Sequence, residues 1–232
     1  MGVTEIAILP IQEGKTFDDT STADGRLHAE LLKDLLSQPG CQRCYWGRQV
    51  ENKNVLRWFI DWDRMEHHRK FIDSDAYKYF VSRLSDLLGG APRVYHAYFN
   101  PNTPFAIFGS TTTIATEIVN MYFPTSYSNE DKTKVANDVS AFIAVLEREE
   151  TAYRATTCGW VEEDVDIPGT TEKTRVFVLL IGRTSVDAHL SFRNTKAFAE
   201  YIHLLHSAKH LKKLETVYAS LTEATSAFRW SS

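Results

Sequence analysis

The chain has 232 residues, of which 43% are hydrophobic and 12% aromatic, so it is long and apolar enough to bury a sizeable core. Its formal net charge of -4 provides no attraction for nucleic acid or for an anionic membrane surface. The sequence therefore indicates a partner that is a small molecule or another protein.

The start of the chain shows no secretory pattern, because no basic segment is followed by an apolar run. No apolar stretch approaches the roughly 18 residues that a membrane helix needs. Three cysteines without a framework spacing fit a reducing compartment. We expect a cytoplasmic protein without a membrane partner.

The first hundred residues predict six elements in the order strand, helix, strand, strand, helix, strand. Apolar periodicity and turn residues place them at 4–11, 27–36, 41–50, 55–62, 64–88 and 93–99. Ser74 and Asp75 favour a break within the second helix. In the strand at 55–62, period-two alternation puts Leu56, Trp58 and Trp62 on one apolar face.

The second half of the chain repeats the first. Residues 176–201 align without a gap with residues 55–80, at a constant offset of 121 that places His189 on His68. Thr116-Glu117-Ile118 aligns with Thr4-Glu5-Ile6 at an offset of 112, and the difference is a hairpin, at 162–174, that is nine residues longer. A repeat of this length predicts two copies of one unit.

The repeat predicts the domain boundaries. We expect a first unit at 1–99, a linker at 100–115, a second unit at 116–221 and a C-terminal tail at 222–232. The second unit should contain strands at 117–123, 152–161, 175–182 and 214–221, with helices at 129–150 and 186–210. Phe228 and Trp230 in the tail are suited to covering an apolar edge.

The order β-α-β-β-α-β is that of the ferredoxin-like split βαβ unit. With Trp62, His68 and Phe71 at the junction of the third strand and second helix, the unit resembles the dimeric α/β-barrel superfamily, and within it the antibiotic biosynthesis monooxygenase type. The resemblance covers residues 4–99 and 116–221. It implies an α+β fold in which two ferredoxin-like βαββαβ units of one chain form an intramolecular dimeric α/β barrel.

The resemblance does not select an activity, because the family includes cofactor-free oxygenases, haem-degrading enzymes and polyketide cyclases. The haem-degrading branch combines an asparagine on the first strand with a tryptophan and a histidine. In the first half, Ile8 stands at the position of the asparagine. The second half has Asn120 at that position but Arg183 at the position of the tryptophan. Since neither half carries the full set, we expect no haem and no other cofactor.

No metal site is predicted either. His203, His206 and His210 follow one another at helical spacing, but the row ends among lysines and indicates a solvated face.

The first half carries the larger aromatic and polar set, and we predict the working pocket there. The residues of this set are Trp46, Trp58, Trp62, His96 and Tyr98, where the second half has Cys158, Leu179, Arg183, Val217 and Ala219. The alternative is that the rings only pack a core. His68, which recurs as His189, could likewise serve only to anchor a helix.

The candidate site residues fall into two groups. As catalytic residues, able to move protons near neutral pH, we predict His68, His96 and Tyr98. As substrate-binding residues we predict Trp46, Trp58, Trp62, Asn120, Arg183 and His189.

The favoured function is a cofactor-independent enzyme of natural-product metabolism that cyclises or isomerises a hydrophobic polyketide- or terpenoid-like intermediate. One alternative is a cofactor-free monooxygenase of an electron-rich phenol or anthrone. Another is a non-catalytic small-molecule-binding or stress-associated protein. We expect a monomeric pseudo-dimer or a homodimer, with no nucleic acid partner.

Overall fold

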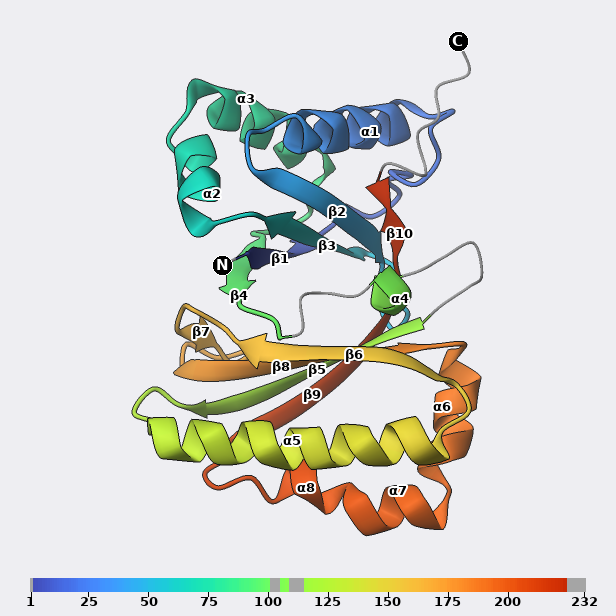
Figure 1. The fold of residues 1–232 in the computed structure, drawn as a ribbon. Coiled ribbons are helices and arrows are strands. Elements are labelled where there is room, and N and C mark those ends of the chain that lie inside the picture. The colour runs from blue at the N-terminus through green and yellow to red at the C-terminus, as the bar shows by residue number, and fades with distance from the viewer. Residues whose placement is uncertain (1, 101–104, 109–114, 225–232) are drawn as a thin grey trace. The chain divides into compact units, whose positions relative to one another are not determined.

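A computed structural model of the protein describes residues 2–100, 105–108 and 115–224. The chain divides into two compact units. The first consists of Met1–Tyr98 together with the chain from Ser220 onward, and the second of Phe99–Ala219. Figure 1 shows the elements of both.

The first unit is an antiparallel sheet with helices packed on one face. The strand order is β10-β2-β3-β1-β4. Its elements are β1 (Val3–Pro10), α1 (Ala23–Leu36), β2 (Cys41–Arg48), β3 (Val55–Trp62), α2 (Met65–Ile72), α3 (Asp75–Leu84), a 3-10 turn (Ser85–Leu87), β4 (Arg93–Ala97) and β10 (Thr222–Glu223).

The second unit has the same plan, with the strand order β6-β8-β5-β9 and a short β7 paired with β8. Its elements are α4 (Phe105–Phe108), β5 (Ala115–Pro124), α5 (Asn129–Glu149), β6 (Tyr153–Trp160), β7 (Val165–Asp166), β8 (Lys173–Arg183), α6 (Val186–Arg193), α7 (Lys196–Tyr201), α8 (His203–His206) and β9 (Lys213–Ser220). The predicted α+β fold of two ferredoxin-like units is confirmed.

Helix breaks recur at equivalent positions in the two units. Ser74 accepts a hydrogen bond from the backbone of Tyr77 and begins α3, and Thr195 does the same for Phe198 and α7. The continuous helix predicted at 186–210 is therefore wrong. It is divided into α6, α7 and α8. The hydroxyl cap of Thr195 favours a new helix start at α7 over continuation, whereas α8 begins after Ile202 without a side-chain cap.

The segments predicted as linker and tail contain regular structure. Within 100–115, Phe105–Phe108 forms α4, in which Ile107 and Phe108 are buried. Thr222 and Glu223 form β10 and pair with Trp46 and Tyr45 of β2. Phe228 and Trp230 lie outside the described residues.

Gly47 of β2 makes room for the chain that leads into β10. A Cβ atom at Gly47 would lie 1.8 Å from the backbone oxygen of Ser220, which no side chain can tolerate. Gly47 is therefore required for the close approach of the two backbones.

Within the described parts of the chain, no helix is both long enough and apolar enough to cross a membrane.

The core of the first unit is built around Trp58, whose exposed fraction is 2%. Its indole N–H donates to Nε2 of the fully buried His28 (3.2 Å), whose Nδ1 lies 3.0 Å from the carbonyl oxygen of Phe17. Because a carbonyl can only accept, the imidazole donates through Nδ1 and accepts at Nε2. His28 is thus a neutral core residue, and burial lowers its pKa to about 4.

Replacing Trp58 should test this packing. Because the ring is enclosed, we expect Trp58→Ala to lower the free energy of unfolding by about 3–5 kcal/mol, and Trp58→Phe to lower it less. Urea denaturation followed by circular dichroism measures both. A loss below about 1 kcal/mol for Trp58→Ala would show that the ring is not part of the core.

His28 should make the fold sensitive to acid. Its folded-state pKa of about 4 lies below the ordinary value of 6.5, so the unfolded chain binds a proton that the folded chain does not. The contribution of neutral His28 to the stability of the fold is fully present above pH 6.5. As the pH falls toward 4, the free energy of unfolding decreases by about 3 kcal/mol.

The measurement is the free energy of unfolding from pH 7.5 to 4 for the native chain and for His28→Gln, which cannot take up this proton. We expect a flatter pH dependence for the variant. The same pH dependence for the variant and the native chain would contradict the assignment of His28 as a neutral core residue.

Candidate functional site

In each unit, a glutamate of the first strand meets a histidine of the helix that follows the third strand. His68 Nε2 lies 3.2 Å from Glu5 Oε2, and His189 Nε2 lies 3.5 Å from Glu117 Oε1. All four side chains are buried. The repeat therefore preserves a carboxylate and imidazole pair, and not only a histidine.

The alternation of the first strand explains how the carboxylate comes to lie under the helices. Glu5 shares a face of β1 with Val3, Ala7 and Leu9, which belong to the core between sheet and helices. Glu5 and Glu117 were missed among the candidate residues. The available signal was a charged residue on the apolar face of a strand, repeated in both halves.

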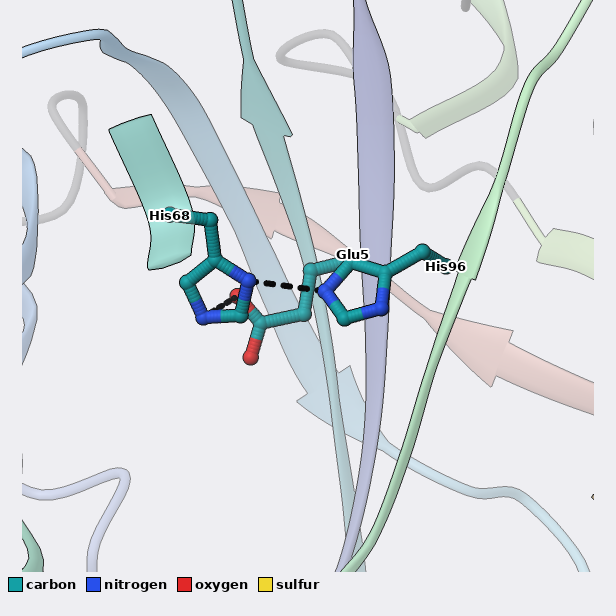
Figure 2. Close-up of side chains that lie close together, drawn as sticks. All are labelled: Glu5, His68 and His96. Atoms are coloured by element: carbon teal, nitrogen blue, oxygen red, sulfur yellow. Dashed lines mark hydrogen bonds and ion pairs between the residues drawn. The ribbon is translucent and has the colours of Figure 1, made fainter. Parts of the chain in front are cut away.

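The first unit extends this pair with a second histidine. Glu5 of β1 and His96 of β4 are register partners, so their side chains leave the sheet on the same face. His68 contacts both of them (Figure 2), and its Nδ1 lies 2.7 Å from His96 Nε2. An arrangement that satisfies both contacts has His96 donating to His68 and His68 donating to Glu5, which is a route for a proton.

Trp62, at the end of β3, holds this cluster in place. Its indole N–H donates to Glu5 Oε2 (3.0 Å), and its ring stacks on His68 with centroids 4.8 Å apart and planes at 22°. Both the carboxylate and the imidazole are thereby oriented by one neutral side chain.

The second unit has Arg183 at the position of Trp62. Its guanidinium, 1% exposed, binds Glu117 through Nε (3.0 Å) and also pairs with Glu150, at the end of α5. His189 Nδ1 faces Glu150 Oε1 at 3.7 Å, just beyond hydrogen-bonding distance. One fixed positive charge and one imidazole therefore lie between two buried carboxylates.

Both units have a cavity between sheet and helices, at equivalent positions. The first, of about 40 Å³, borders on Glu5, His68 and Trp58, and the second, of about 280 Å³, borders on Glu117, His189 and Arg183. The equivalent wall residues are Ala7, Ile60, Tyr77 and Leu84 in the first unit, and Val119, Ile181, Phe198 and Leu205 in the second. The first cavity has room for little more than a water molecule.

The cavity volumes favour the second unit as the ligand site, the reverse of the sequence-based expectation. Trp58 lines the smaller cavity, and Trp46 and Trp62 belong to the same packed core, so the rings fill the space that they were expected to enclose. Tyr98, just past the end of β4, is partly buried and packs against this core.

Of the other expected residues, Arg183 and His189 lie together at the polar end of the larger cavity. Asn120 does not join them. It is three residues from Glu117 on β5 and points to the face away from the helices, where its register partner is Val178.

A twofold six-element plan in one chain, with a buried glutamate and histidine pair under the helices of each unit, is a tandem ferredoxin-like fold. No family model and no curated protein matches the chain.

Solved structures share the fold over their full length. An anthrone oxidase-like protein superposes with a TM-score of 0.67 at 11% identity, covering 98% of this chain and 95% of that chain. A candidate monooxygenase from Fusobacterium nucleatum gives 0.61 at 10% identity, covering 96% and 93%. Another from Lactobacillus acidophilus gives 0.56 at 9% identity, covering 96% and 94%. At such identities the likeness shows the fold.

Removing the charge of Arg183 should destabilise the second unit. Arg183→Met leaves Glu117 and Glu150 buried without their guanidinium, and we expect a loss of about 3–5 kcal/mol in the free energy of unfolding. Adding Glu150→Gln should restore part of this loss, because one buried charge is removed. Urea denaturation of both variants provides the measurement. An Arg183→Met variant as stable as the native chain would contradict the inference that the guanidinium compensates the two buried carboxylates.

Proposed function

We propose that the protein is a cofactor-free monooxygenase that oxidises an electron-rich, hydrophobic phenol- or anthrone-type compound in the cavity of the second unit. The observation that carries the proposal is the cavity of about 280 Å³ with the buried Glu117 and His189 pair at one end. This volume is near the lower end of small-molecule sites, about 300 Å³. The names of the full-length structural neighbours, an anthrone oxidase-like protein and two candidate monooxygenases, support the same reaction class.

The wall of the cavity suits a flat apolar skeleton. Val119, Phe142, Ile181 and Phe198 present aliphatic and aromatic surface between β5, β8 and the helices. A ring system bound there would have its acidic hydroxyl or methylene group near His189. In an enzyme with few reactive groups, such positioning of the substrate supplies much of the rate enhancement.

His189 would act as the general base. Its Nε2 faces Glu117, and its Nδ1 makes no hydrogen bond within the described part of the chain, so Nδ1 is the nitrogen that would take the proton. The carboxylates of Glu117 and Glu150 would stabilise the cation formed in this step. Arg183 binds both carboxylates and keeps them oriented. It is a positioning residue in this scheme.

Deprotonation makes the substrate an electron donor for oxygen. In the net reaction a CH₂ group and O₂ give a carbonyl group and water, and the substrate supplies all four electrons. One oxygen atom enters the carbon skeleton and the other leaves in water. The reaction thus requires a base, a dry apolar site and oxygen, and no external reductant.

Cyclisation or isomerisation of a polyketide- or terpenoid-like intermediate is the second candidate. It is favoured by a second imidazole on the same cavity, that of His206, which could return the proton that His189 removes. Oxygen uptake separates the two reactions, because only the monooxygenase consumes O₂. Catalytic roles for His68, His96 and Tyr98 in the first unit stay predictions.

The test is oxygen consumption and quinone formation with anthrone and its hydroxylated derivatives, corrected for spontaneous oxidation. We expect His189→Gln to lower kcat by about 10²–10⁴-fold, because the base is lost. The matched control is His203→Gln, on the exposed side of α8, which should retain activity.

A His189→Gln enzyme as active as the native chain would overturn the assigned base. Turnover without oxygen uptake would exclude the monooxygenase and favour the isomerase or cyclase. Binding of these compounds without any turnover would favour a small-molecule-binding protein.

A further inference from the structure

We propose that Glu5, His68 and His96 of the first unit form a binding site for a first-row divalent metal ion, with zinc as the reference ion. One ligand atom from each residue lies within 4.8 Å of the other two. The exposed fractions of the three residues are 8%, 3% and 8%. The site lies in the other unit from the proposed catalytic cavity and does not depend on that proposal.

The donor set has the chemistry of a transition-metal site. Two imidazole nitrogens and one carboxylate oxygen are ligands of zinc, and the same combination binds non-haem iron(II). A divalent cation would also offset the charge of the Glu5 carboxylate, which is costly to bury beneath the helices. Because the carboxylate is buried, a cation would stabilise it more than it would stabilise a solvent-exposed cluster of acids.

The two imidazoles require little movement. His68 Nδ1 and His96 Nε2 are 2.7 Å apart, a spacing that implies a shared proton. Ligands of a tetrahedral zinc ion with bonds of about 2.0 Å are roughly 3.3 Å apart, so the rings would separate by about half an ångström. The ion would replace the proton between the two nitrogens, and the Glu5 carboxylate, which now faces Nε2 of His68, would turn toward the ion to provide the third ligand.

A neighbouring side chain orients the proposed ligands, as residues that hydrogen-bond to metal ligands do in metal sites. Trp62 donates to Glu5 and stacks on His68, which restricts both side chains. The cavity of about 40 Å³ beside Glu5 and His68 can accommodate a water-sized fourth ligand.

The second unit offers an internal comparison. It keeps the Glu117 and His189 pair, but Arg183 stands in place of Trp62, and the β9 ring that lies against His189 is that of Tyr218, with centroids 5.9 Å apart. The guanidinium already binds the carboxylate and would repel a cation, and a phenol lies where the first unit has its second imidazole. Both differences make the second unit a poorer site for a metal ion.

The experiment uses the full chain, stripped with a chelator and titrated with Zn²⁺ and Co²⁺. We expect one ion per chain by elemental analysis, with visible Co²⁺ absorption bands from nitrogen and oxygen ligands. Binding should weaken in acid, as protons compete for the imidazoles. His96→Val, which removes one imidazole ligand, and Glu5→Gln should weaken binding by more than the roughly 10–100-fold lost on mutating outer partners.

His189→Gln and His203→Gln are the matched controls and should bind the ion as the native chain does. Circular dichroism establishes that each variant is folded, and Glu5→Gln provides a second test if His96→Val does not fold. A folded native chain that binds neither ion would overturn the proposal. Equal affinity in His96→Val and in the native chain would overturn it as well.

Discussion

Each unit is organised around a carboxylate that the first strand places beneath the helices. Burying an uncompensated carboxylate would cost several kcal/mol, so its neighbours must supply hydrogen bonds or positive charge. The histidine after the third strand does part of this in both units. A further position also contributes, occupied by Trp62 in the first unit and Arg183 in the second.

The surroundings of the two carboxylates differ at this position and beside it. An indole satisfies Glu5 without adding charge, and the neighbourhood gains a second imidazole from β4. A guanidinium adds a charge, and the neighbourhood gains a second carboxylate, that of Glu150. One copy thus has two imidazoles beside its carboxylate, whereas the other has a guanidinium and a second carboxylate beside a larger cavity.

Much of the fold could be predicted from the sequence, because it depends on local signals. The period-two alternation of apolar residues at 55–62 and the hydroxyl at Ser74 each act over a few residues, and the repeat shows that the same order of elements occurs twice. The two-residue strand β10 could not be predicted, since a pair of residues has no measurable period.

The site was harder to predict because it depends on which side chains fill the space. An aromatic set can enclose a cavity or occupy it, and only the packing of Trp58 against His28 shows that it is occupied here. Asn120 could have been set aside from the sequence, because its spacing from Glu117 places the two on opposite faces of one strand. Glu5 was overlooked because a single acid in an apolar strand is read more easily as an exposed residue.

The pairing of β10 with β2 affects how the protein is made. The first sheet uses residues that precede and follow the second unit in the chain, so it acquires its outer strand only after the second unit has been synthesised. Until then, the open edge of β2 presents unpaired backbone groups to other nascent chains. For the same reason, cutting the gene between its two repeats would not yield two self-sufficient halves, since the upstream fragment would lack the strand that shields its border.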